Sequence, residues 1–254
     1  MKKKLTIIHL SDLHIGYMNC EHKFATIVHN IIQRESPKKT VIVITGDIVE
    51  YGSREQHVRT AVSFLHTLKK AGFKVLLCPG NHDYGSGFIN NRNVARQFKE
   101  IFLSSYSGFP LVDVIGDYVF IGIDSNAGEL HWYDRFFADG EIGGTQLEKL
   151  RQLLHDPKYE HKMKIVYLHH HPTELFPFHQ LKDTDLFQKI VQGVVDVLLY
   201  GHNHFGHNTS GTWGIPVMLD GGSSTGKRMF LRKVFHRMIR LPELTVVKKD
   251  YLSS

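Results

Sequence analysis

The 254-residue sequence has little cysteine and no long apolar segment. Cys20 and Cys78 are its two cysteines and lie far apart, so no disulfide framework is expected and a reducing cytoplasm is the default location. No stretch approaches the ~18 apolar residues that a membrane-spanning helix requires. The apolar run after the N-terminal lysines is interrupted by His9 and ends at Ser11, which is too short for a secretory signal. These absences predict a cytoplasmic protein without a transmembrane segment.

Internal repeats, low-complexity tracts and linkers are also missing, so one domain covering residues 1–254 is the simplest organisation. Hydrophobic residues make up 42% of the chain and charged residues 22%, which is typical of a globular protein with a substantial core. The net charge of +6 favours anionic partners but is too small to indicate nucleic acid. The sequence leaves the oligomeric state open.

Short apolar runs recur along the chain, and most of them end at a polar or glycine-rich cluster. Runs of this length, rich in β-branched and aliphatic residues, predict buried strands. The predicted strands are Leu5–Leu10, Thr40–Thr45, Phe73–Cys78, Val119–Ile123, Lys164–Leu168, Val194–Tyr200, Ile215–Leu219 and Leu244–Val247.

Helical patterns lie between the strands of the first 200 residues. The predicted helices are Asn19–Arg34, Glu55–Ala71, a segment that starts near Thr145, and Asp185–Gln192. Ser53-x-x-Gln56 and Thr145-x-x-Glu148 have the spacing of capping boxes, so we expect side-chain caps there. The alternation of strands and helices predicts an α/β fold with helices on the faces of a sheet.

The polar clusters at the strand ends are rich in the side chains that bind metals, and the chain contains 18 histidines. The clusters are Asp12-x-His14, Gly46-Asp47, Gly80-Asn81-His82-Asp83, His169-His170-His171 and Gly201-His202-Asn203-His204. Loops beyond the carboxyl ends of the strands of an open α/β sheet converge on one crevice, so we expect these clusters to meet. Carboxylate, imidazole and amide ligands without thiolate suit Mn, Fe, Zn or Co.

Spacing within the clusters supports a metal site. Residues i and i+2 of an extended segment point the same way, so Asp12 and His14 are expected to face one ion, and His202 and His204 one cavity. Two adjacent ions need a bridging carboxylate, and Asp47 is the natural candidate. Each cluster alone is more often a turn or a surface feature. Five such clusters in order, each at a strand end, favour a metal centre.

This ordered set of motifs resembles the calcineurin-like metallophosphoesterase superfamily from Asp12 to His204. Gly122-Ile-Asp-Ser125, Gly140-Glu-Ile-Gly-Gly144 and Gln146-Leu-Glu-Lys-Leu150 are in addition similar to single-domain class III cyclic-nucleotide phosphodiesterases. The resemblance implies a four-layer αββα sandwich of two mixed β-sheets flanked by helices. It also implies a metal-dependent phosphoesterase in which a hydroxide activated by two divalent ions attacks phosphorus.

The resemblance also implies a set of ligands. It assigns one ion to Asp12, His14, Asp47 and His204, and the second to Asp47, Asn81, His170 and His202. Pro172 selects His170 among the three histidines, because the ligand of this motif usually stands two residues before a proline. His169 and His171 then either contact phosphate, support the ligands or simply pack. Glu50 stands where many relatives have Asp, outside the ligand set.

The predicted catalytic residues follow the ligand Asn81. His82 is placed by spacing to protonate the leaving oxygen as a general acid. Asp83 either orients the His82 ring or caps the segment that follows.

Several functions share these motifs. The leading prediction is hydrolysis of a small phosphodiester or phosphomonoester, with a cyclic nucleotide as the first substrate to test. A lipid-sugar pyrophosphatase, a DNA nuclease and a non-catalytic scaffold that keeps the fold are the alternatives. Such nucleases usually carry an extra DNA-capping region after the last motif, and only 50 residues follow His204. Scaffolds typically lose ligands, and none is missing here.

Two other features invite interpretation. Gly221–Lys227 nearly spells a P-loop, but Arg228 stands where Ser or Thr should hold magnesium, so we interpret it as a turn near the rim of the site. Lys227 and Arg228 are candidates for contact with an anionic substrate.

The basic stretch Lys227–Arg240 is interpreted as an element with one buried face rather than a lipid or nucleic-acid surface. The aromatic segment Leu130–Phe137 is either an overhanging loop or packing at the sheet edge.

Overall fold

The computed structural model describes residues 2–86, 91–103, 107–126, 140–173, 181–226 and 234–253. Within these ranges the helices are α1 (Cys20–Arg34), α2 (Glu55–Lys70), α3 (Arg92–Phe102), α4 (Gly144–Leu154) and α5 (Thr184–Val191). The strands are β1 (Leu5–Leu10), β2 (Thr40–Thr45), β3 (Lys74–Cys78), β4 (Leu111–Ile115), β5 (Tyr118–Gly122), β6 (Met163–Tyr167), β7 (Val197–Tyr200), β8 (Val217–Asp220), β9 (His236–Leu241) and β10 (Thr245–Lys249).

The strands form two five-stranded sheets, and both are mixed. The first has the order β10-β9-β1-β2-β3, in which β1, β2 and β3 are parallel and β9 runs antiparallel to β1. The second has the order β4-β5-β6-β7-β8, in which only β4 is antiparallel to its neighbour. The carboxyl ends of β1, β2 and β3 therefore lie at one edge of the first sheet, and those of β5, β6 and β7 at one edge of the second.

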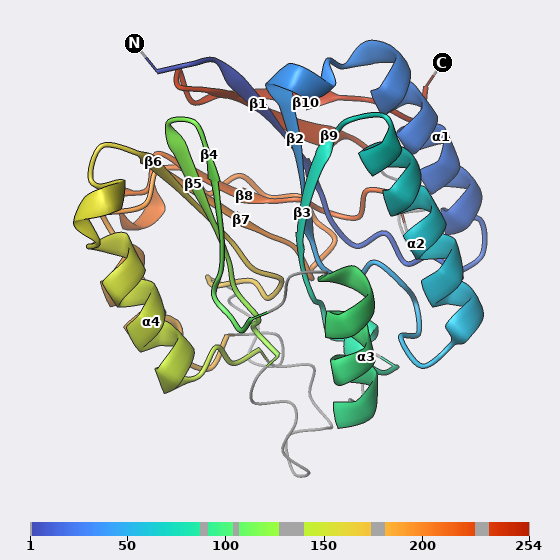
Figure 1. Ribbon diagram of the computed structural model, residues 1–254, viewed down its shortest axis with the longest axis horizontal. Coiled ribbons are helices and arrows are strands. Elements are labelled where there is room, and N and C mark those ends of the chain that lie inside the picture. Colours follow the sequence, from blue (N-terminus) through green and yellow to red (C-terminus); the bar gives the residue numbers. More distant parts are fainter. Residues whose placement is uncertain are drawn as a thin grey trace.

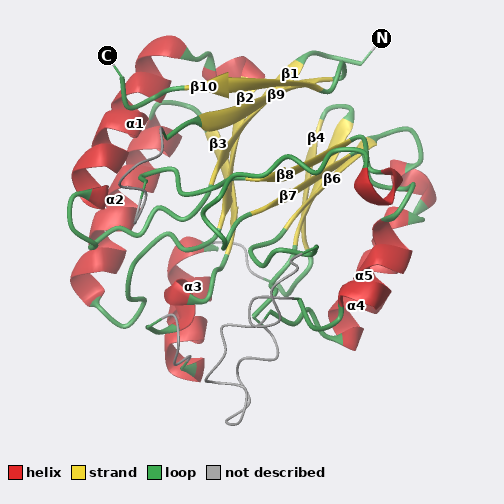
Figure 2. Ribbon diagram, turned by 180° about the vertical axis from the view of Figure 1, so that it is seen from behind, coloured by secondary structure: helices red, strands yellow, loops and turns green. Residues whose placement is uncertain are grey.

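Helices cover the outer face of each sheet, as Figures 1 and 2 show. Phe24 of α1 belongs to the core on the first sheet together with Ile42 and Ile44 of β2. Leu147 of α4 belongs to the core on the second sheet together with Val166 of β6. Helix, sheet, sheet and helix thus make the four-layer αββα sandwich that the motifs predicted.

A third core lies between the sheets and fixes their spacing. Val43 of β2 packs in it with Phe120 of β5 and Leu199 of β7, and all three are fully buried. Successive side chains of a strand point to opposite faces, so β2 sends Ile42 and Ile44 to the helices and Val43 to the other sheet. Burial on both faces explains why β2 is a continuous apolar run rather than an alternating one. Each such side chain contributes about 1.5–3 kcal/mol to folding.

Neither predicted capping box forms. Arg54 precedes α2 without a side-chain cap, and Gly143 precedes α4, again without one. At α4 the helix begins at Gly144, so Thr145 lies inside the helix and not at the N-cap. The Asp183 carboxylate accepts hydrogen bonds from the N–H groups of Ile142 and Gly143, just before the helix, at 2.8 to 3.1 Å.

The late part of the chain completes the first sheet. Residues 236–240 of the basic stretch form most of β9, in which Arg240 is the exposed residue, so both faces of the strand are buried rather than the one that was predicted. The remaining part of that stretch, residues 227–233, and the aromatic segment Leu130–Phe137 lie outside the described residues.

No helix in the described ranges is long and apolar enough to cross a membrane. Cys20 and Cys78 are both buried and form no disulfide.

Candidate metal centre

Four of the predicted ligands form one tight group at the carboxyl ends of the strands. Asp12 and His14 follow β1, Asp47 follows β2 and His204 follows β7. The Nε2 atom of His204 lies 3.1 Å from Asp12 Oδ1 and 3.1 Å from His14 Nε2. His14 Nε2 is also 3.9 Å from Asp12 Oδ1 and 3.7 Å from Asp47 Oδ2. The group offers two carboxylates and two imidazoles to one point.

A second group shares Asp47 with the first. His169, which follows β6, has its Nε2 atom 3.0 Å from Asn81 Oδ1 and 3.5 Å from Asp47 Oδ1. His202 Nδ1 lies 3.1 Å from the same nitrogen of His169. Asp47 Oδ2 is near His14 and Asp47 Oδ1 is near His169. A carboxylate placed in this way has one oxygen available for each of two ions.

Hydrogen bonds at Nδ1 of His14 and of His169 determine which ring nitrogen faces the other predicted ligands. His14 Nδ1 lies 3.0 Å from Glu50 Oε2, and His169 Nδ1 lies 2.7 Å from the Thr45 carbonyl oxygen. An ionised carboxylate and a carbonyl can only accept, so each Nδ1 carries the proton and each neutral ring keeps its lone pair on Nε2. Metal-binding histidines usually have outer partners of this kind.

The nitrogen and oxygen atoms that meet in these two groups are suited to bind a cation. His169 Nε2 and Asn81 Oδ1 are both acceptors, so their lone pairs repel at 3.0 Å unless a proton or a metal ion lies between them. Burial raises the pKa of Asp12, but the nearby His204 and a hydrogen bond from Ser11 lower it by more, and the net shift is downward. Asp12 is therefore ionised at neutral pH. A buried carboxylate beside imidazole lone pairs is a donor set for a divalent ion.

Backbone strain is concentrated at these residues. Of the eight non-glycine residues with positive φ in the described part of the chain, five are predicted ligands: Asp12, His14, Asp47, His202 and His204. The left-handed conformation costs about 1–3 kcal/mol for such residues and persists where function requires it. The assumption that Asp12 and His14 share a face of an extended segment is therefore wrong, because left-handed turns bring them together.

At two glycines of the polar clusters, Gly80 and Gly201, there is no room for a side chain. A Cβ atom at Gly80 would lie 2.2 Å from Asp47 Oδ1, and one at Gly201 would lie 1.9 Å from Ser11 Oγ. Both distances are far below contact, so only glycine lets these loops approach the ligand loops.

The His170 ring lies beside the second group, with its centroid 4.6 Å from that of His202. Its Nδ1 lies 2.8 Å from the Ser125 hydroxyl, and a Cβ atom at Gly140 would lie 2.4 Å from its ring. The histidine whose Nε2 lies near Asn81 Oδ1 and Asp47 Oδ1 is His169.

His82 lies beside the first group of ligands. Its ring packs edge-on against the His14 ring with the centroids 4.8 Å apart. Its Nδ1 lies 2.8 Å from the Glu50 carbonyl oxygen, so Nδ1 carries a proton and Nε2 is the atom left for exchange with a substrate. Its backbone N–H donates to Asp47 Oδ1 at 3.0 Å. Glu50 thus orients His14 through its side chain and His82 through its backbone.

Asp83 does not orient His82. Its carboxylate accepts hydrogen bonds from the backbone N–H groups of Ile48, Val49 and Gly80 at 2.9, 3.1 and 2.8 Å. Burial is the main cause that raises its pKa well above the ordinary value, and these three bonds act in the opposite direction. Asp83 therefore ties the loop after β2 to the loop after β3.

His171 lies close to His207 and Asp220, and the three form a third group of side chains of the types that bind metals. Its Nδ1 accepts the Thr173 N–H at 3.2 Å, so its neutral ring carries the proton on Nε2, unlike His14 and His169. Its ring packs against Tyr200 with centroids 4.5 Å apart. This arrangement favours a packing role over a metal ligand.

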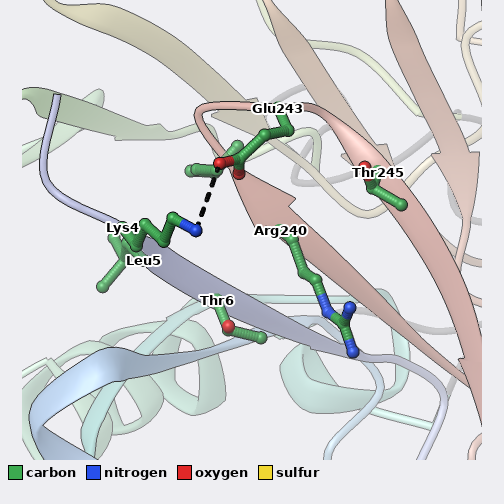
Figure 3. Close-up of a pocket in the computed structure, with 7 residues that line it drawn as sticks. Lys4, Leu5, Thr6, Arg240, Glu243 and Thr245 are labelled. Carbon is green, nitrogen blue, oxygen red and sulfur yellow. Dashed lines mark ion pairs between the residues drawn. The ribbon is translucent and has the colours of Figure 1, made fainter. Parts of the chain in front are cut away.

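The pocket in Figure 3 lies at the other end of the first sheet. It is lined by Lys4, Thr6 and Arg240, and its Lys4–Glu243 ion pair spans 3.8 Å. Thr6 pairs with Arg240 near the start of β1, whereas Asp12 follows the end of that strand. This pocket is therefore separate from the metal centre.

Comparison with known proteins agrees with the geometry. Residues 5–206 match the family model described as Calcineurin-like phosphoesterase. The chain is 28% identical over 171 residues to a probable glycerophosphodiester phosphodiesterase, GpdQ, of Arcobacter nitrofigilis, covering 65% of this chain and 50% of that protein. It is 27% identical over 195 residues to the 3',5'-cyclic adenosine monophosphate phosphodiesterase CpdA of Haemophilus influenzae, covering 74% of this chain and 62% of that one. The match thus spans half of the first relative and less than two thirds of the second.

A solved structure extends the likeness of the fold. A dimetal phosphatase from Danio rerio superposes with a TM-score of 0.71 at 13% identity, covering 97% of this chain and 99% of that one. The family model includes every predicted ligand from Asp12 to His204. On this match, the chain belongs to the calcineurin-like phosphoesterase family.

Proposed function

We propose that this chain hydrolyses a phosphate ester of a small molecule with the help of two divalent metal ions. The observation that carries the proposal is the position of Asp47, whose two carboxylate oxygens lie near His14 on one side and His169 on the other. A shared carboxylate of this kind is what a pair of adjacent ions requires.

The proposed ligands differ from the predicted set at one position. Asp12, His14, Asp47 and His204 hold the first ion. The second ion is held by Asp47, Asn81, His169 and His202, with His169 in place of His170. The convergence of the Asn81 oxygen and the His202 nitrogen on His169 Nε2 supports this choice. Mn, Fe, Zn and Co all suit these ligands.

Two divalent ions, when bound, lower the pKa of a shared water and neutralise charge on the phosphoryl oxygens. The chain itself supplies the proton for the leaving oxygen. His82 is the proposed general acid: its Nδ1–H stays bonded to the Glu50 carbonyl, and the imidazolium form of the ring gives up the proton on Nε2 to the leaving oxygen. Asp12 and Asp47 would hold the ions through their carboxylate oxygens, so they do not compete for this role.

The proposed substrate is a small phosphodiester, with a 3',5'-cyclic nucleotide as the first candidate. Both curated relatives carry the name of a phosphodiesterase, one for glycerophosphodiesters and one for cyclic AMP. A cytoplasmic location, which the two buried free cysteines suit, completes the proposal.

A substrate panel tests the proposal. The metal-loaded protein is assayed on bis-p-nitrophenyl phosphate, cyclic AMP, a phosphomonoester, single-stranded DNA and a lipid pyrophosphate. We expect hydrolysis of the first two, its loss after treatment with a chelator and its return with Mn²⁺. Asp47→Ala protein purified in the same way controls for contaminating phosphatases. Hydrolysis of none of the substrates would support a scaffold, and activity confined to DNA or the lipid would overturn the substrate class.

A further inference from the structure

The Gly/Ser-rich segment after β8 lies along the loop that carries Asp12 and His14. We call residues 221–225 of this segment the clasp. It follows Asp220 at the end of β8 in the second sheet and lies beyond residues 5–206, which the family model matches. The residues that it contacts on the first sheet lie more than 200 residues earlier in the sequence.

Ser224 forms the centre of the clasp. Its N–H donates to the Ser11 carbonyl oxygen at 2.9 Å, and the Ser11 N–H donates to the Ser224 hydroxyl at 2.9 Å. The Ser224 carbonyl oxygen lies 3.0 Å from His236 Nε2 on β9. Because His236 Nδ1 accepts the Tyr251 N–H at 3.2 Å, Nε2 carries the proton and donates to Ser224. The clasp is thus supported from behind by the C-terminal strands.

Two neighbouring hydroxyl groups continue the contact along the ligand loop. The Ser223 hydroxyl donates to the Asp12 carbonyl oxygen at 3.1 Å, and the Thr225 hydroxyl donates to the Leu13 carbonyl oxygen at 3.0 Å. Ser223 and Thr225 are 3% and 0% exposed, so water does not reach these bonds. Three successive clasp residues therefore satisfy three successive carbonyl groups of the ligand loop, beginning at Ser11.

The ligand loop needs such partners because its conformation is strained. Asp12 and His14 have φ values of 52° and 47°, and both side chains are fully buried. Strained residues persist only where surrounding contacts over-determine them, and a buried carbonyl without a donor is costly. Gly221 lets the clasp approach, because a Cβ atom there would lie 2.7 Å from Ser11 Cβ.

We propose that the clasp hydroxyls are positioning groups that hold Asp12 and His14 in their ligand geometry and so set the affinity of the metal site that these residues share. The inference rests on the proposed function for the identity of the ligands. Removal of one hydroxyl leaves the fold and the chemistry in place but lets the loop relax. The affinity for one of the two ions then falls, while turnover recovers when the metal is in excess.

Thr225→Val tests the proposal, because it replaces a hydroxyl by a methyl group of similar size. Chelator-treated full-length protein is titrated with Mn²⁺ in a calorimeter, and hydrolysis of bis-p-nitrophenyl phosphate is measured at limiting and saturating Mn²⁺. We expect one of two sites to bind at least about tenfold more weakly, the size typical of a lost outer partner. Activity at limiting metal should fall in parallel and return to within about twofold of the wild type at saturation.

Three further proteins make the result decisive. Thr225→Ser retains the hydroxyl and should keep wild-type affinity. Thr209→Val removes a hydroxyl that donates to the Met218 carbonyl at 3.4 Å and lies 2.6 Å from the Tyr200 hydroxyl, away from the ligand loop, and should also keep wild-type affinity. Ser223→Ala should repeat the loss seen in Thr225→Val. Equal affinity in Thr225→Val and wild type, or an equal loss in Thr209→Val, overturns the clasp, whereas a wild type that binds no metal overturns the proposed function instead.

Discussion

The two sheets supply chemically different halves of the metal centre. Among the proposed ligands, the first sheet provides Asp12, His14, Asp47 and Asn81, which offer three oxygen groups and one imidazole, whereas the second provides His169, His202 and His204, which are all imidazoles. Each proposed ion takes ligands from both sheets. Neither half alone has the ligands for either proposed site, so the packing of sheet on sheet is itself a condition for metal binding.

The halves also differ in how they are held. The ligand loops of the first sheet bind each other, since Asp12 N–H donates to the Gly46 carbonyl at 3.1 Å and His14 N–H to the Asp47 carbonyl at 3.0 Å. The second sheet depends on the first, because the Thr45 carbonyl orients the His169 ring. The first sheet thus orients the His169 ring of the second, and the clasp after β8 of the second sheet in turn binds the loop that carries Asp12 and His14.

Loss of the shared carboxylate should have the largest effect. Asp47→Ala removes a ligand from both proposed ions, so we expect both to be lost and activity to fall by several orders of magnitude. Metal content after dialysis and hydrolysis of bis-p-nitrophenyl phosphate measure this. Asp185→Ala, an exposed carboxylate on α5, is the control. Retention of two ions per chain by Asp47→Ala would sink the assignment of the bridge.

The next largest effect distinguishes two adjacent histidines of the second sheet. His169→Ala should lose one of the two ions, because His169 Nε2 faces Asn81 and Asp47. His170→Ala should retain both ions, and the two variants serve as each other's control. Metal analysis decides between them. The reverse pattern would restore His170 as the ligand that the proline spacing predicted.

Replacement of the proposed acid should depend on the leaving group. His82→Ala should slow hydrolysis of cyclic AMP by about 10²–10⁴-fold, the usual contribution of general acid catalysis. The p-nitrophenyl ester should lose much less, since its leaving group needs no proton. Comparison of kcat on the two substrates at saturating metal checks this. Equal losses on both would refute the acid role.

A smaller effect on metal affinity is expected from replacement of Glu50, whose carboxylate lies beside His14 Nδ1. Glu50→Gln removes the charge beside His14 Nδ1 and should weaken binding of one ion by about 10- to 100-fold. Titration with Mn²⁺ measures this, with the exposed Glu160→Gln as the control. The Glu50 carbonyl still holds His82, so kcat at saturating metal should change little. Unchanged metal affinity would show that the Glu50 side chain is dispensable.

The smallest effect concerns the layer between the sheets. Burial and the nearby Arg237 lower the pKa of His9 from 6.5 to about 3. A group whose folded pKa is depressed stabilises the fold above its unfolded pKa and loses that contribution as the pH falls from about 6.5 toward 3. Between pH 6.5 and pH 5 this loss is about 2 kcal/mol.

Urea unfolding of wild type and His9→Gln across this pH range tests the prediction. The variant should lack the about 2 kcal/mol of pH dependence that the wild type shows. The exposed His155→Gln should behave as the wild type does. Identical slopes in wild type and His9→Gln would mean that His9 becomes charged without disturbing the sheet packing.

Local patterns in the sequence predicted most of the fold and of the centre. Strands Leu5–Leu10 and Thr40–Thr45 have the predicted bounds because continuous apolar runs end at the turn residues of the ligand loops. What could not be predicted depends on contacts between distant segments. The orientation of the His169 ring toward Asn81 follows from its hydrogen bond to Thr45, 124 residues away. Nothing in the spacing of three adjacent histidines encodes that bond.

Contacts between distant segments also explain why the sequence alone indicated a simple turn at the clasp. Its Ser and Thr residues look like ordinary turn formers, and their partners lie 211 to 213 residues away on the first sheet. The near-P-loop spelling drew attention to phosphate, whereas the hydroxyl groups bind protein backbone. The sequence analysis did not predict helix α3 or strand β4, although Ala95, Phe98 and Phe102, the buried residues of α3, have helical spacing.

The most direct test of the shared centre is the stoichiometry of metal binding in the wild type. Chelator-treated protein is titrated with Mn²⁺ and followed by electron paramagnetic resonance, with hydrolysis of bis-p-nitrophenyl phosphate measured on the same samples. Ligands from both sheets around a bridging Asp47 predict two ions per chain, magnetically coupled through the carboxylate, and activity that rises as the pair fills. One ion or none per chain, or two ions without coupling, would contradict the account.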